Sequence, residues 1–300
     1  MKKKTYLFAL MAMVLTLGSC SDNENGIGGE TSKYITVSTS IGNMTRVATD
    51  AKGGQTFEEG DEISVYAWTG APTVAPETSE RVVNNAINKL TNGSWISTPQ
   101  MLWKNNREKH YFIGVYPTAA ISDLSAGEYT FDANKQTESD LLVAVNPDGL
   151  SYSADAQQTV PLTFTHVMAK LAVNLTYKNQ WGGIPTVEKV VVGNAAKEAT
   201  INYLTKVVTP STTAKEDFSL PEITENTKYV SVIIPQEDVK QLTIVIGGKN
   251  FVYDNGTPFK LESGKITTVN LEVGRDEIKL GDVKITNWED GSTFSGEALN

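Results

Sequence analysis

The chain has little of the chemistry from which enzyme sites are usually built. Its 300 residues include one cysteine and two histidines, so a disulfide framework is excluded and a metal site would lack the usual ligand pairs. A Ser-His-Asp set is not excluded by spacing, because triads assemble in three dimensions, but no strand–nucleophile–helix turn supports one. We therefore expect no catalytic residue, no metal and no cofactor, and a fold that is stabilised by its core.

Basic residues are also scarce. Lysine and arginine number 26 against 35 aspartate and glutamate residues, which gives a formal net charge of −9. A chain this acidic is a poor candidate for binding nucleic acid or anionic lipid. Charged residues make up only 20% of the chain, and glycine, threonine, valine and asparagine are plentiful, which suits a β-rich extracellular protein.

Long hydrophobic runs are missing as well. The apolar stretch from Tyr6 to Gly18 follows Lys2-Lys3-Lys4 and is shorter than the roughly 20 residues that a bilayer-spanning helix needs. This order of charge and apolar residues is that of a secretory leader. We expect residues 1–19 to be a signal peptide.

The only cysteine stands at the end of this leader. Leu17-Gly18-Ser19-Cys20 replaces the usual small-residue cleavage site and resembles a bacterial lipobox, in which the cysteine is acylated and the leader is cut before it. The resemblance implies a lipid anchor (palmitate) on Cys20 and an acylated linker over residues 20–33, and two or more acyl chains hold a protein stably on a membrane. The alternative is an ordinary signal peptide with a chance cysteine.

A polar, partly acidic tetrad follows the cysteine. Ser21-Asp22-Asn23-Glu24 resembles the acidic export signal of Bacteroides-type surface lipoproteins, which implies an anchor on the outer face of the outer membrane. A plain polar linker is the alternative, since any flexible tether uses the same residues.

Alternation of apolar and polar residues predicts many short strands. The first places Ile35, Val37, Thr39 and Ile41 on one face. Residues 80–90 fit a helix or the first strand of a hairpin, and the turn signal Asn92-Gly93 favours the hairpin. Further strands are expected at residues 63–67, 111–116, 141–145, 171–177, 187–192, 229–234, 241–246, 250–253, 257–261 and 266–273.

The spacing of these strands indicates an all-β fold. Many short strands separated by turn signals are typical of β-sandwiches, and the length suffices for two domains. We predict two tandem sandwiches over residues 34–160 and 161–300, with a seam near residue 160. His166 is expected to pack at this seam, and His110 is expected at the surface.

Several motifs, in this order along the chain, together resemble the fimbrillin family, the pilin subunits of Bacteroides-type (type V) fimbriae. The resemblance implies an all-β fold of two transthyretin-like (Ig-like) sandwiches and no enzymatic activity. The motifs are the lipoprotein leader, Thr45-Arg46, Phe57-x-x-Gly60-Asp61-x-Ile63-x-Val65-Tyr66-Ala67, Tyr111-Phe112-x-Gly114-Val115-Tyr116-Pro117, Phe164-x-His166-x-x-Ala169-Lys170-Leu171, Leu261-x-x-Gly264-Lys265 and Trp288-Glu289-Asp290-Gly291.

The resemblance also implies a processing site. In polymerising members of the family an Arg-specific protease cuts the loop after the first strand, and the matching bond here is Arg46–Val47. The cut would remove the lipid on Cys20 and the first strand together. An apolar groove with unpaired backbone groups would remain, which is a template for a donor strand. The alternative is that Arg46 is a solvated loop cation.

The donor in the family comes from the C-terminal segment. Residues 278–300 are therefore expected to be a donor or latch, with Val283 and Ile285 on one face and Trp288 after them. The alternative is a last strand that pairs within its own subunit, because edge strands do both.

We interpret the chain as a surface lipoprotein that becomes a fimbrial subunit in adhesion or biofilm formation. Its expected partners are other pilin subunits, the membrane through Cys20 before processing, an Arg-specific protease and a host protein or glycan receptor.

The main alternative is a surface glycan-binding lipoprotein, which needs two or more exposed tryptophans on one flat face; tryptophan in a sandwich is more often core. A surface hydrolase would need a cleft with convergent ionisable groups. The five tryptophans are Trp68, Trp95, Trp103, Trp181 and Trp288.

Overall fold

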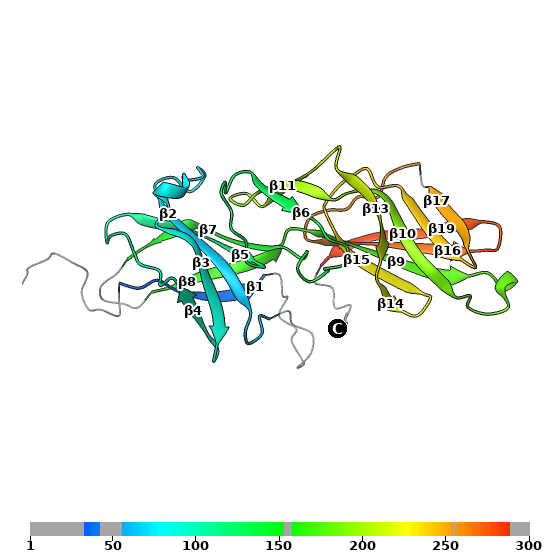
Figure 1. The fold of residues 1–300 in the computed structure, drawn as a ribbon, viewed down its shortest axis with the longest axis horizontal. Helices are drawn as coiled ribbons and strands as arrows, with labels where there is room; N and C mark the ends of the chain where they lie inside the picture. The colour runs from blue at the N-terminus through cyan, green and yellow to red at the C-terminus, as the bar shows by residue number, and fades with distance from the viewer. Residues whose placement is uncertain (1–32, 43–55, 153–157, 255, 289–300) are drawn as a thin grey trace, which may run out of the picture.

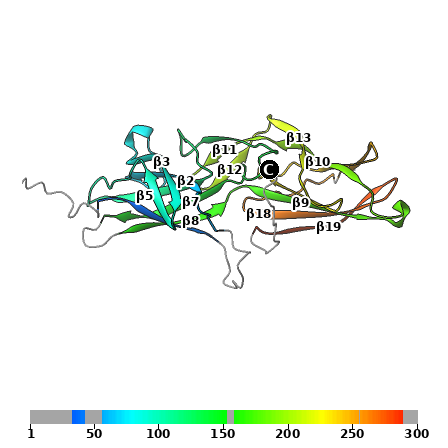
Figure 2. The ribbon, with the colours of Figure 1, turned by 60° about the horizontal axis from the view of Figure 1, so that its bottom comes forward.

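The computed structural model describes residues 33–42, 56–152, 158–254 and 256–288. These ranges are almost entirely strand and turn, with two short 3-10 helices, η1 (Thr78–Glu80) and η2 (Asn179–Trp181). The predicted all-β class is confirmed. The molecule is elongated, with the strands of the first half at one end and most later strands at the other (Figures 1 and 2). Within the described ranges, no helix is long and apolar enough to cross a membrane.

The first half of the chain forms one seven-stranded sheet. Its neighbouring strands are antiparallel, except that the first pair runs parallel. In spatial order the strands are β1 (Thr36–Ile41), β8 (Thr159–His166), β7 (Leu142–Ser151), β5 (Lys109–Tyr116), β2 (Glu62–Thr69), β3 (Val83–Thr91) and β4 (Ser94–Thr98).

The middle of this sheet is buried on both faces. Along β2, Ile63 and Val65 pack into one apolar cluster, while Tyr66 and Trp68 on the opposite face pack into a second. The same happens along β5, where Gly114 allows a close approach. A Cβ atom at Gly114 would lie 2.6 Å from Phe164 Cζ, so the ring of Phe164 fills the space that a side chain would occupy.

The two edges of this sheet meet. β1 lies against β4, and Trp95 Nε1 on β4 donates a hydrogen bond of 3.0 Å to Thr39 Oγ1 on β1. Residues just before β1 pair with the segment after β4: Ile35 N donates to Met101 O at 3.0 Å. The sheet is therefore rolled around the first cluster, and β1 closes it.

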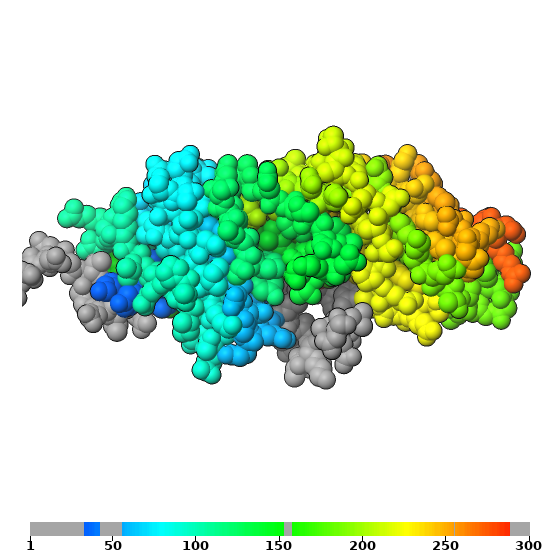
Figure 3. All heavy atoms as spheres, viewed as in Figure 1, coloured from blue at the N-terminus to red at the C-terminus, as the bar shows by residue number. Residues whose placement is uncertain are grey.

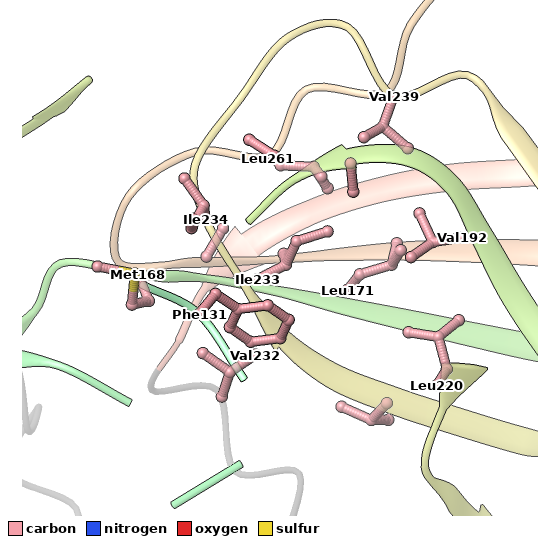
Figure 4. Close-up of a cluster of buried hydrophobic side chains, with 14 of the residues drawn as sticks. Phe131, Met168, Leu171, Val192, Leu220, Val232, Ile233, Ile234, Val239 and Leu261 are labelled. Atoms are coloured by element: carbon pink, nitrogen blue, oxygen red, sulfur yellow. The ribbon is translucent and has the colours of Figure 1, made fainter. Parts of the chain in front are cut away.

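The second half contains two facing sheets. Leu171, Val192, Leu220 and Ile233 pack between them, as Figure 4 shows for part of this core. The four-stranded sheet is β13 (Lys215–Leu220), β10 (Val187–Ala196), β16 (Gln241–Ile246) and β17 (Lys249–Asp254). The five-stranded sheet is β14 (Glu222–Thr224), β15 (Lys228–Ile233), β9 (Ala169–Tyr177), β18 (Lys265–Val273) and β19 (Ile278–Asn287).

A three-stranded sheet spans both halves. Its order is β12 (Val207–Pro210), β11 (Glu198–Asn202) and β6 (Gly127–Thr130). β6 comes from the first half but pairs with β11 of the second, and the two lie side by side in Figure 1. One apolar cluster includes Tyr66 of the first half and Ile201 of the second. The halves therefore share a core, and Figure 3 shows continuous contact between them on this face.

The chain passes from the first sheet to the second at residues 167–168. The predicted seam near residue 160 falls at the start of β8, which still belongs to the first sheet, and β9 begins at Ala169. Val160, Leu162 and Phe164 alternate with more exposed residues along β8 and are buried. Pro161 stands at an exposed position of this strand, and a proline within an apolar run argues against a strand, so the sequence did not predict β8.

The structure confirms one further sequence prediction and contradicts two. The hairpin is confirmed, with β3 and β4 joined at Asn92 and Gly93. The strand predicted at residues 257–261 is wrong: Phe259 N donates to Val239 O at 2.7 Å and only Leu261 forms an isolated bridge. The surface prediction for His110 is also wrong, because its ring is buried against Trp103.

The first prediction concerns the contribution of β1 to the core. Ile35→Ala is expected to lower the free energy of unfolding by about 2–5 kcal/mol, the usual cost of truncating a buried isoleucine. Ser38→Ala, on the exposed side of the same strand, is the matched control and should change it by less than about 0.5 kcal/mol. Urea denaturation of the secreted chain without residues 1–20 measures both, and equal effects would contradict a core role for β1.

Candidate strand-exchange site

β1 occupies a bed made by β8 on one side. Thr36 to Ile41 pair in parallel register with Thr159 to Phe164. One side-chain pair and one further backbone bond reinforce the ladder: Thr36 Oγ1 lies 3.1 Å from Thr159 Oγ1, and Gly42 N donates to Phe164 O at 2.7 Å just beyond the strand. The bed of β1 is defined below as β8, the segment at residues 101–103 and Trp95.

The inward side chains of β1 fill this bed to different depths. Ile35 is 2% exposed and Val37 is 6% exposed, whereas Thr39 and Ile41 are half-buried. These are the four residues that the sequence placed on one face of the first strand. Burying a branched aliphatic side chain contributes about 1.5–3 kcal/mol, so the first two positions hold the strand most strongly.

The other side of the bed consists of irregular chain and one aromatic residue. Trp103 N donates to Lys33 O at 3.2 Å, and this bond continues the pairing with Met101. Further along, Trp95 contacts Thr39 as described above and packs edge-on against Phe57, with ring centroids 5.3 Å apart. β1 is therefore held on both sides, although it is the last strand of its sheet.

The predicted donor strand is β19, at the edge of the five-stranded sheet. It pairs antiparallel with β18 along its length. Val283 is 39% exposed and Ile285 is 37% exposed, although both pair with buried residues of β18. The apolar side chains of β19 are thus less well covered than those of β1.

Trp288 fixes the end of β19 at the junction of the two halves. Its ring stacks on His166, the last residue of β8, with centroids 4.1 Å apart and planes 7° apart. Lys170 Nζ lies over the ring, 4.2 Å from its centroid, and Trp288 N donates to Gly264 O at 3.1 Å. The ring is buried, so this contact group, called the seam latch below, joins β8, β9 and β19.

Electrostatics add to the seam latch. His166 Nδ1 lies 2.8 Å from Asp140 Oδ1, which fixes the plane of the imidazole under Trp288. Burial lowers the pKa of the Lys170 ammonium, and the carboxylate of Asp140 opposes this shift. A cation over an indole ring contributes more when it is desolvated. The latch therefore combines apolar burial with a partly desolvated charge.

The turn beside the latch explains one sequence motif. Gly264 has φ of +68°, a left-handed conformation that favours glycine, and a Cβ atom there would lie 3.1 Å from His166 O. Its N–H donates to Met168 O at 2.8 Å. The glycine of the Gly264-Lys265 pair thus lets this turn approach the residues between β8 and β9.

Three predicted residues, Cys20, Arg46 and Val47, lie outside the described residues. All five tryptophans lie within them, and each is buried or half-buried, so the flat exposed pair that a glycan platform needs is not formed by tryptophans. In the described ranges no group of three or more His, Cys, Asp or Glu side chains is placed to hold a metal.

The geometry defines an all-β protein whose first strand ends its sheet in parallel pairing with β8 and whose last strand is the edge of the five-stranded sheet. The fimbrillin-like family model matches residues 45–288, and the chain belongs to this family. It is a family of fimbrial structural proteins, not of enzymes, and membership supports a subunit that assembles with other pilin subunits in a cell-surface fimbrium.

Solved structures share the fold at low sequence identity. A structure described as a cell adhesion protein from Bacteroides ovatus aligns with a TM-score of 0.62 at 18% identity, covering 85% of this chain and 98% of the other. One from Bacteroides uniformis gives 0.59 at 17% identity, covering 85% and 99%. One from Parabacteroides distasonis gives 0.51 at 12% identity, covering 86% and 97%. No curated protein matches the chain.

The second prediction tests the seam latch. Trp288→Ala should speed amide hydrogen exchange at residues 284–287 at least tenfold, a change of about 1.4 kcal/mol in local stability, because the end of β19 loses its buried anchor. Trp288→Phe keeps a stacking ring and should retain most of the protection. Trp181→Ala, at the far end of the same half, should leave these four amides unchanged. Unaltered exchange in Trp288→Ala would show that the stack does not hold the strand.

Proposed function

We propose that the chain is exported as a lipoprotein, acylated on Cys20, and becomes a pilin of surface fimbriae by strand exchange. An Arg-specific protease cuts Arg46–Val47 and thereby frees β1. The observation that carries this proposal is the attachment of β1: its own side chains and hydrogen bonds hold it in the bed, and its covalent link to β2 runs through residues 43–55, which include Arg46.

A cut after Arg46 separates β1 from β2 without breaking any strand in the described ranges. β1 ends at Ile41 and the described chain resumes at residue 56, ahead of β2. The new terminus at Val47 would precede Phe57, whose ring stays packed against Phe164 at 5.1 Å. The rings of Phe57 and Phe164 therefore both belong to the part of the chain that remains after the cut.

Burial of Ile35 and Val37 keeps β1 in place after a cut. At about 1.5–3 kcal/mol for each side chain, spontaneous loss of the strand is slow, and replacement by an incoming strand is the favourable route. The incoming strand would form the same kind of backbone ladder along β8. The exchange is then driven by differences in side-chain fit, since the backbone bonds lost and gained are alike.

Residues 278–300 are the proposed donor that this subunit offers to the next. Val283 and Ile285 are already partly exposed, so these two side chains lose little burial of their own when they leave β18. Placing them in a bed as deep as that of Ile35 and Val37 would bury more. Trp288 must leave the seam latch during donation, which makes the latch the control point of release.

The third prediction tests processing and assembly together. The secreted chain without residues 1–20 carries Arg107→Lys and Arg275→Lys, because both arginines are exposed, and Arg81 is buried. Brief treatment with an Arg-specific protease should give one dominant cut after Arg46 by intact mass. After a different pilin subunit is added, size-exclusion chromatography should show oligomers that increase with time, because each freed bed accepts the donor strand of that subunit.

Arg46→Lys in the same background is the control and should stay intact and monomeric. A resistant Arg46 alongside cleavage elsewhere would contradict the processing step. A clean cut with no oligomer, even after other pilin subunits are added, would contradict strand exchange.

A further inference from the structure

Trp95 supplies the bed of β1 with a side-chain hydrogen-bond donor. Trp95 Nε1 donates to Thr39 Oγ1 at 3.0 Å, and the indole is held by its edge-on contact with Phe57. Because Trp95 is half-buried, an occupant without an acceptor at this point leaves the N–H poorly satisfied, which is unfavourable. The third inward position of an occupant therefore calls for an oxygen acceptor.

The bed also has a steric limit at its far end. A Cβ atom at Gly42 would lie 2.8 Å from Thr163 Cγ2 and 3.5 Å from Thr165 Cγ2. Threonine is stiff at χ1, and Thr163 Oγ1 is engaged by Ser40 Oγ at 3.2 Å. Glycine is thus the residue that fits this position without displacing β8.

Together these features define a pattern for the occupant. Its first two inward side chains are apolar, like Ile35 and Val37, and the third is an acceptor, like Thr39. The fourth takes the place of Ile41, which lies opposite Phe164 in the pairing register, and is apolar. Glycine follows immediately. The strand runs parallel to β8.

The C-terminal segment of a second copy matches only the start of this pattern. One register places Val283 and Ile285 in the two deep positions and the amide oxygen of Asn287 opposite Trp95. The same register places Glu289 at the fourth inward position and Asp290 at the glycine position. A carboxylate beside Phe164 loses hydration without gaining a partner, and the next side chain meets Thr163.

A second register fails at the same two positions. Ile278 and Leu280 would fill the deep positions, and Asp282 would accept from Trp95. Lys284 would then take the fourth inward position, and Ile285 the glycine position. A large branched residue is least suited to a point where a single methyl group is already too close.

We propose that the bed of β1 selects the donor strand of a different pilin subunit and rejects the C-terminal segment of its own kind, with Trp95 and Thr163 as the specificity-determining residues. This inference rests on the strand exchange proposed above. It makes the subunit part of a heteropolymer: its bed is filled by another chain, and its own donor goes elsewhere.

The test uses the Arg46-cut chain in the Arg107→Lys, Arg275→Lys background and fluorescent synthetic peptides. The peptide of residues 33–42 should exchange into the bed and co-elute with the protein. The peptide of residues 281–290 should show no binding at concentrations at which the first peptide saturates. Within the first peptide, Thr39→Val and Gly42→Val should each increase the dissociation rate about tenfold.

A protein variant isolates the hydrogen bond. In Trp95→Phe the ring contact with Phe57 is kept and the N–H is lost, so peptide 33–42 and its Thr39→Val form should dissociate at equal rates. Equal binding of peptides 281–290 and 33–42 would overturn the selection of a different subunit while leaving strand exchange intact. Failure of peptide 33–42 itself to exchange would overturn strand exchange in this bed, and with it the inference.

Discussion

The parallel ladder between β1 and β8 holds the first half of the molecule closed. β8 carries this ladder on one edge and the antiparallel pairing with β7 on the other, so it lies between β1 and the rest of the sheet. Contacts from Trp95 and the residues around Met101 then join the two edges of the sheet through β1. One strand of six residues thereby determines whether a rolled sheet is closed or open.

β8 also connects the bed to the seam latch. β8 ends at His166, whose imidazole stacks on the ring of Trp288. The end of β1 pairs with Phe164, and Trp288, just after β19, stacks on His166 two residues further along β8. A change in the pairing of β1 and a change in the position of Trp288 would therefore act on residues of β8 that are two positions apart.

The sequence predicted several strands whose two faces differ in polarity. Val269, Leu271 and Val273 of β18 are buried and alternate with more exposed neighbours, as expected. β2 is buried on both faces and was still predicted, over residues 63–67. The short strands β6 and β11 were not predicted, although Ala199 and Ile201 of β11 are buried and alternate with more exposed neighbours. The inward residues of β1 were predictable from their alternation, whereas the Trp95–Thr39 bond depends on sheet closure, which no local pattern encodes.

The long path between β1 and its partner has a consequence for folding. Thr36 and Thr159 are 123 positions apart in the chain, so their contact requires closure of a large loop and forms slowly compared with local hairpins such as β3–β4. We expect β1 to dock last, onto a half that is already folded. A strand that arrives after its surroundings are complete can also leave without unfolding them, and this order of events agrees with the strand exchange proposed for β1.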